Sequence, residues 1–138
     1  MRLFLDSSAF AKRFAEEPGS QQVEDLCSQA AELCLSIICV PEIISALNRR
    51  LREKLLTQDE YVKVKRRLSE DVRDAVIINL TPMVVQSSIA VLERNPVRTM
   101  DALHVASAMV CHADLFVSSD HRQLAAAKNT GLETKQIC

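Results

Sequence analysis

Residues that stack on nucleic-acid bases and residues that form flexible linkers are both scarce in this sequence. It has no tryptophan, one tyrosine, four phenylalanines, two glycines and four prolines among 138 residues. An aromatic platform for stacking bases is therefore not expected. Long linkers are not expected either, and a hydrophobic content of 48% is enough for one compact core. We predict a single domain that spans residues 1–138.

Neither disulfide bonds nor a membrane segment is expected. The five cysteines have no paired spacing, which is typical of a reduced, cytoplasmic protein with small buried thiols. A zinc site is an alternative, but Cys34, Cys39, Cys111 and His112 lack the short loop spacings that such sites use. We expect no signal peptide, because residues 2–5 are a very short apolar stretch that leads straight into an acid. No apolar run approaches the roughly 20 residues that cross a membrane.

Basic charge is confined to one part of the chain. The net charge is −1, so no global positive field marks the protein as a nucleic-acid binder. Residues 48–73, however, carry nine Lys and Arg against five Asp and Glu, a balance of +4, while the remainder carries −5. Arg49 and Arg50 belong to this basic stretch. We interpret it either as a surface that holds RNA or as a solvated helical pair that binds a partner or a second copy.

Short apolar runs alternate with helical patterns along the whole chain. The runs that predict strands cover residues 2–5, 33–39, 75–80, 115–117 and 132–137. Helical patterns fill the intervals and end near residues 16, 31, 55, 73 and 94, with two more that contain Asp101 and follow Asp120. Ser7 or Ser8 is expected to cap the first helix, and Thr99 the helix that contains Asp101.

This alternation indicates an α/β domain with a mostly parallel sheet covered by helices on both faces. In such sheets, ligands bind beyond the carboxyl ends of the strands, at the point where the strand order reverses. Asp6 and Asp120 lie just past predicted strands. Glu42 lies a few residues past another, in the first turn of a helix that Pro41 suits as a first residue. We therefore expect these three acids at one edge of the sheet.

Asp101 completes a candidate set of four carboxylates with Asp6, Glu42 and Asp120. It opens a helix that is apolar nearly all the way round and should be buried, a setting in which acids are rarely found without a partner. Two carboxylates about 4 Å apart repel by about 4 kcal/mol at an effective dielectric of about 20, unless they share a cation. All-oxygen ligands suit Mg²⁺ or Mn²⁺, which hold phosphates and activate water, so one interpretation is phosphodiester hydrolysis. The other is four unrelated helix caps and first-turn acids, with Gln123 completing a capping box after Asp120.

Three further polar residues lie near the acids in the sequence. Ser8 and Ser118 flank two of the acids and can hydrogen-bond them or a bound phosphate, or serve only as caps. His104 lies one turn after Asp101. It can donate to a carboxylate, although a histidine with its hydrogen bonds satisfied in the core is the simpler interpretation.

Four segments, LDSSAFAKRF, PEIISAL, MDALHVASA and FVSSDHRQLAAA, together resemble the PIN domain family in their order and spacing. They are most similar to the toxin subunits of VapBC-type toxin–antitoxin pairs, and the resemblance runs nearly end to end. It implies three layers, α/β/α, around a parallel five-stranded sheet. It also implies an Mg²⁺- or Mn²⁺-dependent endoribonuclease, usually a homodimer, that a DNA-binding antitoxin silences. The family's acids fall on Asp6, Glu42, Asp101 and Asp120, and its small polar residues near the metal fall on Ser8 and Ser118.

Other functions stay open beside this one. A stand-alone PIN nuclease in RNA processing would have the same residues, and a non-cleaving RNA-binding module would not need all four acids. A receiver-like domain or a phosphatase would share only the acid after the first strand. A haloacid-dehalogenase phosphatase would need a second Asp at the position of Ser8. Ser119 departs from the family, in which a bulky residue is common there, but this does not alter the acids.

Overall fold

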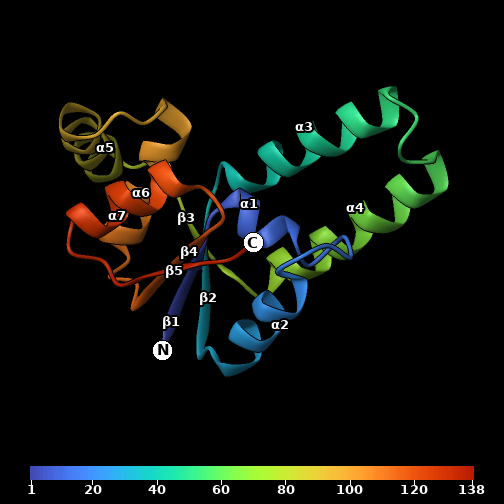
Figure 1. The fold of residues 1–138 in the computed structure, drawn as a ribbon, viewed down its shortest axis with the longest axis horizontal. Coiled ribbons are helices and arrows are strands. Elements are labelled where there is room, and N and C mark those ends of the chain that lie inside the picture. The colour runs from blue at the N-terminus through green and yellow to red at the C-terminus, as the bar shows by residue number, and fades with distance from the viewer.

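The computed structural model describes all 138 residues, with seven helices and five strands (Figure 1). The strands are β1 (Arg2–Leu5), β2 (Glu32–Ser36), β3 (Val76–Ile78), β4 (Leu115–Ser118) and β5 (Thr134–Gln136). The helices are α1 (Ser7–Ala11), α2 (Ser20–Gln29), α3 (Cys39–Arg52), α4 (Gln58–Arg73), α5 (Pro82–Arg94), α6 (Thr99–Val110) and α7 (His121–Asn129). Every predicted strand and helix is present, although most of the predicted strands are shorter.

The five strands form one parallel sheet in the order β3-β2-β1-β4-β5. Helices α1–α4 pack on one face and α5–α7 on the other (Figure 1). This confirms the predicted three-layer α/β/α architecture. The strand order reverses between β1 and β4, and a crevice at such a switch point is where parallel sheets bind ligands.

Side chains that alternate along the central strands build two cores. Leu3 and Leu5 of β1 pack under α1–α4, and Phe4 between them joins the core under α5–α7. In β4, Phe116 stacks on Phe4 with 5.6 Å between ring centroids, and Val117 faces the opposite core. Because both faces of the sheet are covered, these strands are continuous apolar runs in the sequence.

Two helices begin differently from the prediction. Asp6, rather than either of the serines that follow it, caps α1, because its Oδ1 accepts a hydrogen bond from the Ala9 N–H at 2.9 Å. Arg98, rather than Thr99, is the N-cap residue of α6, and no side chain caps that helix. The first difference matters for the site, because it fixes the Asp6 carboxylate directly at the end of β1.

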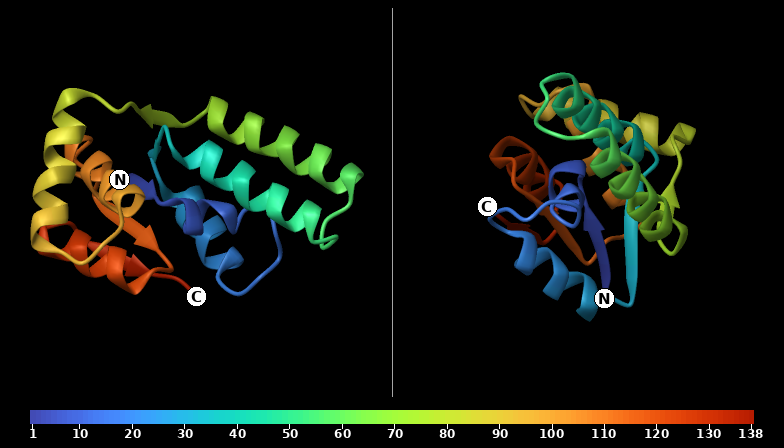
Figure 2. Two further views of the ribbon diagram at one scale, coloured as in Figure 1. Left: turned by 90° about the horizontal axis from the view of Figure 1, so that it is seen from above. Right: turned by 90° about the vertical axis from the view of Figure 1, so that its right-hand side faces the viewer.

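Helix α3 begins at Cys39, two residues before Pro41, and β2 ends at Ser36, earlier than expected. A proline is tolerated in a first helical turn, where its missing N–H has no partner to lose. Glu42 consequently stays in the first turn of α3. Beyond Glu42, α3 and α4 form a hairpin that projects from the sheet and carries Arg49 and Arg50 (Figure 2).

None of the seven helices combines the length and the hydropathy that a bilayer crossing would require.

Candidate active site

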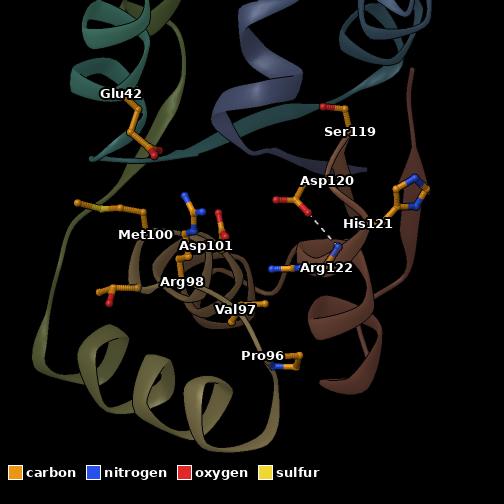
Figure 3. A pocket seen from close by; sticks show the side chains of 11 residues that line it. Glu42, Pro96, Val97, Arg98, Met100, Asp101, Ser119, Asp120, His121 and Arg122 are labelled. Carbon is orange, nitrogen blue, oxygen red and sulfur yellow. Dashed lines mark hydrogen bonds between the residues drawn. The ribbon is translucent and has the colours of Figure 1, made fainter.

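A cavity of about 920 Å³ opens next to the carboxyl end of β4, at the switch point of the sheet (Figure 3). Three parts of the chain surround it: the start of α3, the segment that leads into α6, and the turn that leads into α7. Its lining residues are Glu42, Pro96, Val97, Arg98, Thr99, Met100, Asp101, Ser119, Asp120, His121 and Arg122. The cavity therefore lies where the sequence placed the acids.

Three of the four predicted acids line this cavity. Glu42, Asp101 and Asp120 come from α3, α6 and α7, and their carboxylates face the same open space (Figure 3). Asp6 does not line it, because only 2% of Asp6 is exposed. The structure thus brings the set together as three acids on the wall and a fourth buried behind them.

Asp6 is held by four different groups. Its carboxylate accepts hydrogen bonds from the Ala9 N–H, from the Ser8 hydroxyl at 2.8 Å, and from the Ser118 hydroxyl at 2.7 Å. The fourth donor is the Gln123 amide, at 3.0 Å. Burial raises the pKa of Asp6 above its ordinary value, although the hydrogen bonds from Ser118, Ala9 and Ser8 and the charge of His104 oppose the rise. Both serines that the family resemblance places near a metal are therefore hydrogen-bonded to Asp6, and Ser118 is fully buried.

Gln123 links the buried acid to the cavity wall. Its Nε2 donates to Asp6 Oδ2 at 3.0 Å and to Asp101 Oδ1 at 3.3 Å, so one amide group bridges two carboxylates. The sequence predicted Gln123 only as the capping-box partner of Asp120, and that box does not form, because the Asp120 N–H donates to Ser118 Oγ while the Gln123 side chain bonds the two acids. Asp120 does cap α7, by accepting from the N–H groups of Arg122 and Gln123. The bridge itself has no sequence signal, because it depends on which way the side chain turns.

Glu42 is held by a different pair of groups. Its Oε1 lies 2.6 Å from the Ser7 hydroxyl and 2.6 Å from His104 Nε2. Burial works to raise the pKa of Glu42, but the hydrogen bonds from His104 and Ser7 together hold it below its usual range. His104 is buried in the core, but the simpler interpretation, in which its hydrogen bonds are satisfied there, is wrong. Its Nε2 bonds the Glu42 carboxylate and so positions it, and its Nδ1 has no partner.

Asp101 is affected by its acidic neighbours. Partial burial raises its pKa, and the charge of Asp120 raises it further. The backbone of Arg98 and the charge of His104 act in the opposite direction. An acid whose proton is retained by nearby negative charge is one that a cation would stabilise in its ionised form.

Two arginines that the sequence analysis did not single out lie at the cavity. Arg98 and Arg122 are exposed, line the wall between the acids, and form no ion pair. Arg49 and Arg50, the predicted substrate-binding pair, do not line it; Arg50 lines a separate groove between α1, α3 and α4.

The chemistry of the acids fits a hard divalent ion. All of the donors are oxygens, which suits Mg²⁺ or Mn²⁺. In this arrangement, no three His, Cys, Asp or Glu side chains are grouped so as to hold one ion. The carboxylates are instead turned toward protein donors. The zinc alternative, built from Cys34, Cys39, Cys111 and His112, has no support in the structure, because these side chains are not grouped around one point and the three cysteines are packed in the core.

The fold and the acid-lined cavity at its switch point define a class of α/β proteins, and comparison with known sequences identifies the family. The sequence model of the PIN domain matches residues 3–129. The ribonuclease VapC3 of Pyrobaculum aerophilum is 31% identical over 108 residues, which cover 78% of this chain and 82% of that protein. The chain therefore belongs to the PIN domain family.

Solved structures share the fold at much lower identity. The DNA-bound VapBC complex of Salmonella typhimurium contains a chain that matches with a TM-score of 0.73, at 12% identity, over 100% of this chain and 99% of that one. A chain of a toxin–antitoxin complex from Klebsiella pneumoniae matches with a TM-score of 0.68, at 14% identity, over 89% and 90% of the two chains. These matches support the fold over most or all of this chain.

Proposed function

We propose that this protein is an Mg²⁺- or Mn²⁺-dependent endoribonuclease that acts as the toxin of a toxin–antitoxin pair. The observation that carries the proposal is the convergence of Glu42, Asp101 and Asp120 on one cavity, with Asp6 hydrogen-bonded behind Asp101 through a shared amide. The name of the VapC3 relative supports the choice of RNA as substrate.

The four acids would hold the ion. When bound, a divalent ion of this kind polarises a phosphodiester and activates water for hydrolysis. His104 and Ser7 hold Glu42 in place, and Ser8 and Ser118 hold Asp6, so these side chains position the carboxylates. Carboxylates held in place in this way would need less reorganisation when the ion binds.

Arg98 and Arg122 are suited to hold the RNA backbone. A guanidinium binds phosphate oxygens in a bidentate manner, and both side chains stand beside the acids without another charged partner. Arg49 and Arg50 lie on the projecting hairpin and would reach only more distant phosphates of a longer RNA (Figure 2). The basic hairpin would therefore attract the RNA backbone at a distance from the acids, and Arg98 and Arg122 would bind the phosphates at the cavity.

Cleavage of a mixed-sequence RNA pool tests the proposal. Wild-type protein should cleave with Mg²⁺ or Mn²⁺ and stop when EDTA is added. Asp101→Asn should lower the rate by a factor on the order of 10² to 10³, as when other charge-stabilising groups are removed. Glu93→Gln, an exposed acid on α5, is the matched control and should cleave normally. Binding of RNA without cleavage at any metal concentration would contradict the proposal and favour a non-cleaving RNA-binding module.

The groove between α1, α3 and α4 is where an antitoxin segment would bind. Its volume is about 560 Å³, and its walls are mostly hydrophobic, including Phe14, Ile43, Leu47 and Leu55. Glu42 lies in the first turn of the same helix that forms one wall, so a segment held in the groove could place an arginine near the acids. A stand-alone nuclease would have no such partner.

The arginine is tested with the antitoxin itself. Changing the C-terminal arginines of the antitoxin to glutamine should abolish inhibition while the complex still forms, because a guanidinium is the group best matched to a cluster of carboxylates. Full inhibition by the altered antitoxin would instead indicate that it blocks the path of the RNA.

A further inference from the structure

Gln123 occupies an unusual position for a neutral side chain. It is 2% exposed, and its Nε2 donates to one carboxylate oxygen of Asp6 and one of Asp101. Its Oε1 is buried and has no hydrogen-bond partner. A buried amide usually has hydrogen-bond partners for both its oxygen and its nitrogen. In Gln123 only Nε2 has partners, so the two carboxylates alone orient the amide.

The bridge acts on a pair of like charges. The charge of Asp6 is one of the causes that raise the pKa of Asp101. A cation shared by the two would remove this repulsion, and an NH₂ group with two hydrogens does part of the same task. The other donors to Asp6, which are Ala9, Ser8 and Ser118, have no hydrogen bond to Asp101. Gln123 is therefore the only side chain that joins these two acids.

We propose that Gln123 is a positioning residue that substitutes for the divalent ion in the metal-free protein and competes with it for the same carboxylates. This inference rests on the metal site proposed above. Its Nε2 bonds to Asp6 and Asp101 must weaken when a cation binds both carboxylates, since a donor and a cation cannot both take the same lone pairs. Gln123 thus stabilises the metal-free site and lowers the affinity of the site for the divalent ion.

The test separates stability from metal affinity. Gln123→Met keeps the volume and removes the amide, and Gln123→Glu replaces it with a third carboxylate. Melting temperatures are measured in EDTA and across a Mn²⁺ titration, and Mn²⁺ binding is measured by calorimetry. Gln86→Met, at an exposed position on α5, is the control for the substitution itself.

Both variants should melt below wild type in EDTA, because the repulsion of Asp6 and Asp101 is no longer offset. Both should gain more from Mn²⁺ than wild type does and bind it several-fold more tightly, with the larger effect for Gln123→Glu. Equal losses with and without Mn²⁺, at unchanged affinity, would mean that Gln123 only fills the core, and would overturn this inference while leaving the metal site intact. No response to Mn²⁺ in wild type or in either variant would overturn both.

Discussion

Asp6 and Glu42 illustrate how the same fold treats two carboxylates in opposite ways. The pKa of Asp6 is raised, mainly by burial, so the folded protein keeps a proton that the unfolded chain loses near pH 3.8. The stabilisation that this proton brings is complete below that pH and is lost as the pH rises through the folded pKa. The pKa of Glu42 is lowered, so its stabilisation is present above 4.5 and is lost as the pH falls through its folded pKa.

These signs predict opposite pH profiles for two variants. Without metal, the free energy of unfolding of wild type minus that of Asp6→Asn should fall as the pH rises above 3.8. The slope should be about 1.4 kcal/mol per pH unit until the folded pKa is passed. The free energy of unfolding of wild type minus that of Glu42→Gln should instead decrease as the pH drops below 4.5. Urea denaturation at several pH values, in EDTA, measures both. Parallel profiles for the two variants would contradict the environments described here.

The position of Arg98 and Arg122 at the cavity predicts that both contribute to RNA binding. Arg98→Gln and Arg122→Gln should each weaken RNA binding and reduce the slope of log affinity against log salt by about 1, because each removes about one phosphate contact. Arg94→Gln, at an exposed position near the end of α5, should leave the slope unchanged. Fluorescence anisotropy with a labelled RNA in Ca²⁺ or EDTA measures binding without cleavage. An unchanged slope in both cavity variants would mean that the phosphates lie elsewhere.

What the sequence revealed about single residues depended on their distance from a strand. Asp6 and Asp120 were predictable because each follows a continuous apolar run, and parallel strands bring their carboxyl ends to one edge. Gln123 was not predictable as a bridge, because its two partners are 117 and 22 residues away along the chain. The sequence allowed His104 to donate to a carboxylate, but it did not indicate which one, because Glu42 is 62 residues away along the chain.

At the scale of elements, α3 connects two surfaces. Its first turn carries Glu42 at the cavity, and its middle carries Leu47 in the hydrophobic groove. The helix and the hairpin were predictable from their periodicity, and the structure starts α4 with a capping box of Thr57 and Glu60. The apolar residues of α3 predicted a surface for a partner beside Glu42, and Ile43 and Leu47 do line the groove. Its shape was not predictable, because it depends on the angle at which α4 and α1 meet α3.

A single substitution in α3 should separate the two surfaces. Leu47→Glu places a charge in the groove and should weaken antitoxin binding by at least tenfold, since a charge buried without a partner is strongly unfavourable. RNA cleavage by the free protein should be retained, because Leu47 is not part of the acid-lined cavity. Calorimetry and the cleavage assay are run on the same preparation. Normal antitoxin binding would place the partner on another surface.

For the whole molecule, the outer face of α5 is the most conspicuous exposed apolar surface. Val85, Ile89 and Leu92 are spaced as one helical stripe, and they are 44%, 51% and 36% exposed. Met100 and Leu80, also exposed, belong to the segments on either side of this helix. A contiguous apolar stripe on a protein surface commonly marks an interface.

We expect this stripe to form the interface of the homodimer that the family resemblance implies. Ile89→Glu should yield a monomer, because it places two charges in the centre of a twofold contact. Light scattering after size-exclusion chromatography gives the mass, and circular dichroism checks that the variant is folded. A wild-type protein that is monomeric at every concentration would contradict the prediction, as would an Ile89→Glu variant that stays dimeric.

The capping role of two of the acids has a consequence for how such a sequence can change over generations. Asp6 and Asp120 each begin a helix, whereas Glu42 and Asp101 lie within first turns and cap nothing. A descendant freed from the need to cleave RNA would still need its helices to start, so folding would keep positions 6 and 120 among Asp, Asn, Ser and Thr. Positions 42 and 101 would be free to drift. Inactive descendants should therefore be recognisable by the loss of the second pair before the first.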